Sequence, residues 1–218
     1  MTSLAARERR ALVDALTSAG PDAPTLCSGW QTRHLAAHLV IRERRPDTVP
    51  GLLSPRLSAW TERVLHRQSE RPYAELVREI EVGPPWFSPF ALPGVDAAAN
   101  LAEHFVHTED VLRAQPGWAP RTLGTDDQGQ LWATLVKRAR LLLRKAPVPL
   151  LLVTTDETTS PEHAQIALGP DPSDRRVTLA GAPAELILYA HGRADAAQLQ
   201  ITGPDDAVRA LAAFRPKV

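Results

Sequence analysis

Three side chains with metal-binding chemistry recur at helical spacing in one segment of the chain. Glu103 and His107 are four residues apart, and Asp110 follows three residues later. On a helix these positions share one face, so a carboxylate oxygen and an imidazole nitrogen can bind the same ion. Asp110 could then orient the ligating imidazole from behind. The alternative is a solvated helix face with hydrogen bonds between successive turns, and this segment taken alone favours it.

A second segment offers imidazoles at the same spacing. His34 and His38 are four residues apart, and His38 shares its face with Leu35 and Leu39, so we expect it to point inward. A single inward histidine is more often a hydrogen-bonded core residue than a ligand. Helical bundles, however, build metal sites from inward side chains on facing helices. Together, the two segments make the metal hypothesis as strong as the alternative.

Zinc fits a site of two imidazoles and one carboxylate with an open fourth position. That position would hold water or a thiol. The same ligands would also accept Ni²⁺, Fe²⁺ or Mn²⁺, because ligand type alone does not select among these ions. Cys27 precedes a Ser-Gly-Trp run and is either a reactive thiol near such a site or a small apolar filler in a loop, and the filler is favoured.

The elements that must position these residues follow from the spacing of apolar residues and from prolines and glycines. Helices are predicted at residues 3–19, 32–44, 58–68, 73–81, 96–114 and 126–143. After Lys145 the pattern changes to short strands at 149–155, 164–168, 176–179 and 198–202, with helices at 182–191 and 204–214. The sequence therefore predicts a helical metal-binding domain, residues 1–146, followed by a small α+β domain, residues 147–218.

Composition restricts the partners and the location of the protein. Basic and acidic residues number 25 each, so the net charge of zero gives no reason to expect nucleic acid or a membrane as a partner. The 218-residue chain has a single cysteine, a polar N-terminus and no apolar run that approaches the roughly 20 residues needed to span a bilayer. These features predict a cytoplasmic protein.

Several segments resemble one known family. Residues 26–30, Leu-Cys-Ser-Gly-Trp, and residues 35–39, Leu-Ala-Ala-His-Leu, resemble the first motif of the DinB-like superfamily branch that includes mycothiol-dependent maleylpyruvate isomerase. Residues 103–110 and the Arg-Ala-Gln-Pro-Gly-Trp run at 113–118 resemble its second motif, and residues 183–193 resemble its small C-terminal domain. The signature at 42–47, Arg-Glu-Arg-Arg-Pro-Asp, is similar to that of an actinobacterial subgroup.

The resemblance implies an α+β protein in which a four-helix DinB-like bundle precedes a domain related to sterol carrier proteins. It implies His38, Glu103 and His107 as ligands of a divalent metal, and mycothiol as the thiol cofactor. Arg193, in the matching Gly-Arg motif, becomes the candidate catalytic residue and contact for the thiol cofactor or an anionic substrate. The family usually has an acid where this chain has His34, so His34 would either leave a supporting role unfilled or offer another nitrogen ligand.

The leading hypothesis is therefore a mycothiol-dependent isomerase or S-transferase that acts on a small electrophilic substrate. The metal would stabilise the thiolate, which would attack an electrophilic carbon. A metal-dependent hydrolase is the second hypothesis, with Glu43 or Asp110 as the base that activates water. The third is a non-catalytic protein, either a metabolite- or thiol-binding protein or one with a closed, structural metal site that has His34 as its fourth ligand.

Overall fold

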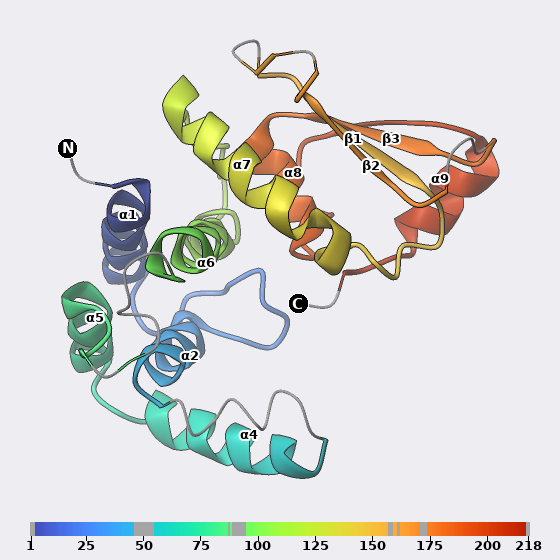
Figure 1. Cartoon of the computed structure of the whole chain (residues 1–218). Coiled ribbons are helices and arrows are strands. Elements are labelled where there is room, and N and C mark those ends of the chain that lie inside the picture. The colour runs from blue at the N-terminus through green and yellow to red at the C-terminus, as the bar shows by residue number, and fades with distance from the viewer. Residues whose placement is uncertain are drawn as a thin grey trace. The chain divides into compact units, whose positions relative to one another are not determined.

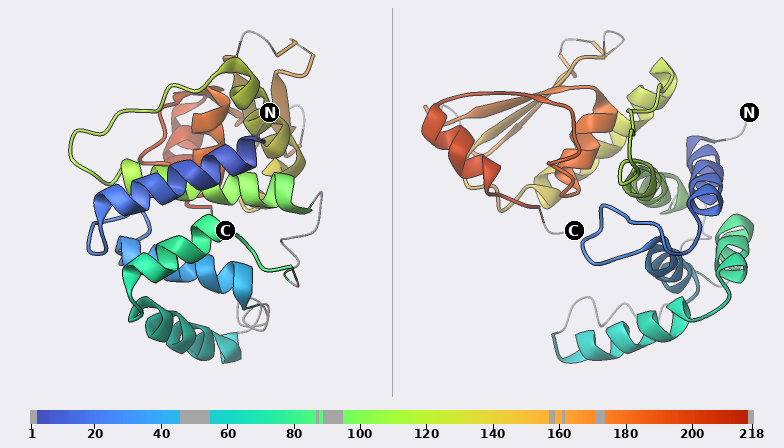
Figure 2. Two further views of the ribbon diagram at one scale, coloured as in Figure 1. Left: turned by 90° about the vertical axis from the view of Figure 1, so that its left-hand side faces the viewer. Right: turned by 180° about the vertical axis from the view of Figure 1, so that it is seen from behind.

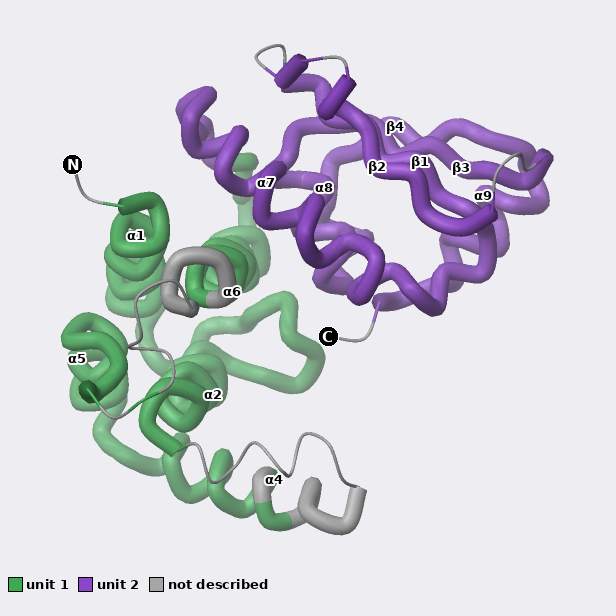
Figure 3. The backbone as a smooth tube through the Cα atoms, viewed as in Figure 1, with its two compact units in different colours: residues 1–120 green, residues 121–218 purple. Residues whose placement is uncertain are grey.

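The computed structural model describes residues 3–45, 55–86, 88, 95–156, 159–160, 162–170 and 174–216, with the backbone alone at residues 55–59, 61 and 95–99. Its residues form two compact units, 1–120 and 121–218 (Figure 3). The α+β class predicted from the sequence is confirmed, since helices and one four-stranded sheet make up the fold. None of the described helices combines the length and apolarity needed to cross a bilayer.

The first unit is helical. Its elements are α1 (Leu4–Ala19), α2 (Thr32–Arg44), α4 (Pro55–Ser69), α5 (Tyr73–Val82) and α6 (Val95–Leu112). Figures 1 and 2 show α1 beside α6, and α2 between α5 and α4. The apolar stripes predicted for these helices form one core, in which Leu12, Leu16 and Leu35 are fully buried. This core fixes the relative positions of α2 and α6, the two helices that carry the candidate ligands.

Local sequence explains where the first two helices begin and end. The Ser3 hydroxyl accepts a hydrogen bond from the backbone N–H of Ala6 and so caps the start of α1, which ends at Gly20 with a φ of 76°. The N-terminus of α2 has a capping box in which Nδ1 of His34 accepts the backbone N–H of Gln31 at 3.2 Å. The bounds of α2 agree with the prediction, since a helix cannot continue easily into Pro46.

The second unit packs helices against a mixed sheet. It contains α7 (Thr125–Leu142), β1 (Leu150–Thr154), β2 (Gln165–Leu168), β3 (Val177–Gly181), α8 (Pro183–Ala190), β4 (Gln200–Thr202) and α9 (Asp205–Ala212). The strand order is β2-β1-β3-β4, with β1 and β3 parallel and both outer pairs antiparallel. Each strand and helix predicted from the sequence in this region is present, with ends that differ by up to a few residues.

The compact units divide before α7, whereas the predicted boundary between residues 146 and 147 falls after it. The reason is the apolar face of α7. Trp132, Leu135 and Ala139 belong to the same core cluster as Leu150 and Leu152 of β1, and α7 lies against α8. The spacing of apolar residues identified α7 as a helix, but it did not indicate which core the helix joins.

Candidate metal centre

Three predicted ligands from two helices come together in the first unit. His38 lies on α2, and Glu103 and His107 lie one turn apart on α6. Oε1 of Glu103 is 3.3 Å from Nε2 of His38 and 3.3 Å from Nε2 of His107. One nitrogen or oxygen from each side chain lies within 4.8 Å of the others. Two imidazoles and one carboxylate converge in this way on a point where a divalent cation would have three protein ligands.

The cluster is partly open. The side chains of His38, Glu103 and His107 are 31%, 23% and 11% exposed, respectively. The rings of His38 and His107 meet edge to face, with their centroids 5.5 Å apart. A site with three protein ligands and an exposed side is typical of zinc centres that bind a substrate or solvent molecule, whereas structural zinc sites are closed by four protein ligands.

The charges in the cluster favour a cation. Burial raises the pKa of Glu103, but hydrogen bonds from His107 and His38 outweigh it and hold this pKa well below its usual range. Burial lowers the pKa of His107, yet hydrogen bonds to Asp110, Cys27 and Glu103 raise it well above its usual value. Without a metal, the carboxylate is thus ionised and the imidazole holds a proton, which a bound cation would have to displace.

Asp110 contacts His107 from the side opposite the cluster. Its Oδ2 lies 2.8 Å from Nδ1 of His107, and its side chain is fully buried. This contact leaves Nδ1 as the donor and turns Nε2 toward Glu103. Asp110 therefore lies where the sequence analysis expected a carboxylate that orients the ligating imidazole.

Comparison with known families agrees with the resemblance seen in the sequence. The family described as the mycothiol maleylpyruvate isomerase N-terminal domain matches residues 2–142. The chain belongs to this family. A crystal structure of a mycothiol-dependent maleylpyruvate isomerase, in a variant with one histidine replaced by alanine, has a similar fold with a TM-score of 0.58. It is 15% identical, and the match covers 93% of this chain and 96% of that chain. No curated protein matches the sequence.

Cys27 makes a polar contact beside the candidate metal centre. The favoured interpretation of this residue as a small apolar filler did not predict such a contact. Its thiol donates to Oδ2 of Asp110 at 3.2 Å, and the neighbouring Leu26 N–H donates to the Asp110 carbonyl at 3.0 Å. Cys27, His107 and Asp110 form a second group of three potential ligands, in which His107 is shared with the first group. The Cys27 thiol thus lies beside the Asp110 carboxylate that contacts the imidazole of His107.

Arg42 lies beside the candidate metal centre, although no role was predicted for it from the sequence. Its Nε lies 3.4 Å from Oε1 of Glu103, and its Nη1 donates to Oδ1 of the buried Asn100 at 2.7 Å. The signal was its position one turn after His38 on the same face of α2. A guanidinium held in this way steadies Glu103 and lowers the pKa of its carboxyl further.

The remaining predicted residues lie outside the cluster. His34 uses Nδ1 in the capping box of α2, and it is absent from both groups of potential ligands among the described residues. Glu43 is buried and forms an ion pair with Arg9 at 2.8 Å. Arg193 belongs to the second unit, where its Nη1 donates to the carbonyl of His191 just after α8. Pro46 and Asp47, which end the subgroup signature, lie outside the described residues.

Proposed function

We propose that this protein binds a divalent metal, with zinc as the first candidate, and uses it with mycothiol in an isomerase or S-transferase reaction on a small electrophile. The observation that carries the proposal is the convergence of His38, Glu103 and His107 in a chain of the mycothiol maleylpyruvate isomerase family. The family match and the similarity in fold to a mycothiol-dependent isomerase support the choice of thiol. The arrangement of a four-helix bundle and a sterol-carrier-like domain remains part of this proposal.

The donor set fits such an ion. Two neutral imidazole nitrogens and one carboxylate oxygen give a net charge of minus one, which leaves positive charge to stabilise an anionic fourth ligand. When bound, the metal supplies Lewis acidity, which lowers the pKa of a thiol. Asp110 holds a proton of His107 at Nδ1, so that Nε2 is the nitrogen that would bind the ion after losing its own proton. Arg42 steadies the carboxylate of Glu103 through its contact at 3.4 Å.

The contacts of the competing residues favour thiol chemistry over the alternatives. A hydrolase needs a base that reaches the attacking water, but Glu43 is 2% exposed and paired with Arg9. Asp110 is fully buried and accepts from both His107 and Cys27. A closed structural site would need a fourth protein ligand, and His34 is used in the capping box. For Arg193, contact with an anionic group of the cofactor or substrate is proposed on the resemblance alone.

Metal analysis of matched variants tests the ligand assignment. We expect about one metal ion per chain in the wild type, and its loss in His38→Ala and His107→Ala. His34→Ala is the matched control, because it removes a histidine one turn away on the same helix and should keep the metal. Stoichiometric metal in both His38→Ala and His107→Ala would refute the ligand assignment.

Addition of mycothiol to the Co²⁺-substituted protein tests the thiol. Binding of a thiolate to Co²⁺ should add sulfur-to-metal charge-transfer absorption in the near ultraviolet, and Cys27→Ser excludes the protein's own thiol as its source. Turnover of an electrophilic substrate should then require mycothiol. A spectrum that does not respond to mycothiol, together with turnover in its absence, would favour the hydrolase and contradict the proposal.

A further inference from the structure

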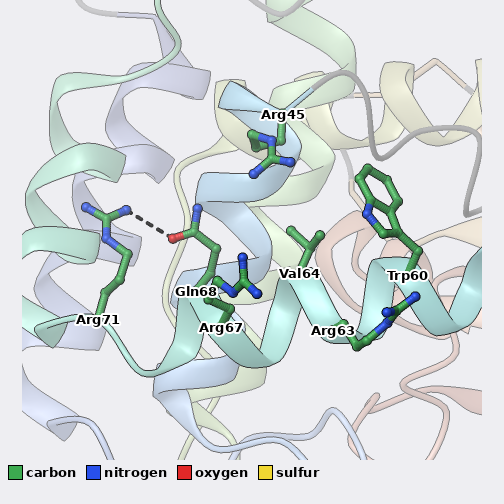
Figure 4. Close-up of a pocket in the computed structure, with 7 residues that line it drawn as sticks. All are labelled: Arg45, Trp60, Arg63, Val64, Arg67, Gln68 and Arg71. Atoms are coloured by element: carbon green, nitrogen blue, oxygen red, sulfur yellow. Dashed lines mark hydrogen bonds between the residues drawn. The ribbon is translucent and has the colours of Figure 1, made fainter.

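A pocket lined largely by arginines lies in the first unit, outside the cluster of His38, Glu103 and His107. It has a volume of about 490 Å³ and lies between the end of α2 and one face of α4 (Figure 4). Four of its lining residues are arginines: Arg45 just after α2, Arg63 and Arg67 on α4, and Arg71 just after α4. None of the lining residues that the structure describes is acidic. We call it the arginine pocket, and its volume is that of a small-molecule site.

The polar side chains around the arginine pocket present hydrogen-bond donors. Guanidinium groups and the indole of Trp60 have N–H donors and no acceptors. Gln68 has one acceptor, Oε1, but this atom already accepts from Nη1 of Arg71 at 3.2 Å. Figure 4 shows the Gln68 amide nitrogen on the side facing away from Arg71. A ligand that complements such a lining carries acceptors only, as carboxylate and phosphate groups do.

The charges on α4 also favour an anion. Arg63 and Arg67 of α4 are four residues apart, so each guanidinium has a like charge one turn away. Arg71 is compensated by Glu79 at 2.5 Å and by Glu75 at 3.4 Å. Arg63 and Arg67 line the pocket as exposed side chains. An anion bound between them would relieve the repulsion that this spacing creates.

We propose that the arginine pocket binds a small polyanion with two or more carboxylate or phosphate groups, and that Trp60 packs against its apolar part. This inference goes beyond the proposed function and does not depend on the metal. Arg45 follows His38 by seven residues, which corresponds to about 10 Å along a helix. The pocket therefore has its own ligand-binding groups and shares none with His38, Glu103 and His107.

Calorimetric titration of the full chain, treated with EDTA and dialysed, tests the proposal. The probes are pyrophosphate for phosphate groups and tricarballylate for carboxylates, with glycerol as the uncharged control. Arg63→Gln/Arg67→Gln should weaken binding by about tenfold or more, because two charge-assisted interactions are lost. Arg10→Gln/Arg78→Gln removes the same charge from exposed positions of α1 and α5 and should leave binding within about twofold of wild type.

The possible results show which kind of anionic group the pocket prefers. They also distinguish this proposal from the proposed function at the metal centre. Binding of pyrophosphate alone indicates a phosphate ligand, and binding of tricarballylate alone indicates a polycarboxylate, and either supports the pocket. Failure of both probes to bind at millimolar concentration overturns it, as does an equal loss in both double variants, which would mean general attraction by net charge. His38→Ala should bind the probe like wild type, whereas its metal content tests the proposed function separately.

Discussion

Replacement of Asp110 by asparagine tests how the fold tunes the candidate metal centre. The substitution keeps the size of a fully buried side chain and removes its charge. We expect weaker metal binding, although Asp110 lies outside the ligand set. The physical reason is that the carboxylate accepts the Nδ1 proton of His107 at 2.8 Å and makes Nε2 a more basic ligand.

The size of the effect follows from this geometry. The contact joins a buried carboxylate to an imidazole that is 11% exposed, so solvent screens it little. Loss of such a supporting partner costs about 10- to 100-fold in metal affinity, and this corresponds to about 1.4–2.8 kcal/mol. The pH dependence has a definite sign. Asp110 raises the pKa of His107, so in the wild type a proton competes with the metal more strongly at pH 6 than at pH 8.

Competition titrations with a chromogenic chelator at pH 6 and pH 8 measure this difference. Asp110→Asn should show the larger loss of affinity at pH 8, because at pH 6 the lower pKa of His107 in the variant partly offsets the weaker ligand. Asp14→Asn, an exposed change on α1, is the control and should leave affinity unchanged. A variant that unfolds more easily but binds metal like wild type would refute the reasoning and leave Asp110 with a purely structural role.

Further predictions concern the ligand environment and the core. Arg42→Gln should reduce metal affinity by less than Asp110→Asn, because it loosens Glu103 without changing a ligand nitrogen, and the same titration measures it. Leu16→Ala should cost about 2–5 kcal/mol of unfolding free energy in denaturant melts, whereas Val136→Ala at an exposed position should cost under about 0.5 kcal/mol. Burial raises the pKa of Glu43, but the His104 imidazole at 3.5 Å and the ion pair with Arg9 outweigh it and lower this pKa. The stabilising contribution of Glu43 is therefore present above the ordinary carboxyl pKa and is lost as the pH falls below it. Glu43→Gln should therefore flatten the acid side of the stability curve, and an unchanged slope would contradict the assignment.

The sequence identified the candidate ligands because their spacing follows helical geometry. Glu103, His107 and Asp110 fall on one face of α6 whatever the tertiary fold, and the apolar neighbours of His38 indicate its inward direction. Spacing alone could not show that this face of α6 meets the face of α2 that carries His38. The resemblance supplied this step, and the Glu103 contacts at 3.3 Å to His38 and His107 agree with it.

Other features depend on contacts between segments that are distant in the chain. The contact of Cys27 with Asp110 joins residues 83 positions apart, and that of Arg42 with Asn100 joins residues 58 apart. A lone cysteine in a loop and an arginine on a helix are compatible with many environments, so neither contact leaves a local pattern. The role of His34 is local in the chain, but its residue type concealed it. A capping box normally has Glu or Gln at the position where this chain uses an imidazole nitrogen.

The loop between α1 and α2 explains why the two motifs belong together. Gly29, with a φ of 77°, permits a turn in which the Trp30 N–H donates to the Cys27 carbonyl at 2.9 Å. The turn places the Trp30 ring 5.3 Å from that of His38 and directs the Cys27 thiol to Asp110. The loop thus contacts a candidate ligand on α2 and the carboxylate that orients a candidate ligand on α6. Residues 26–38 and 103–110 are therefore structurally coupled. A substitution in the loop should change the surroundings of both imidazoles, those of His38 and His107.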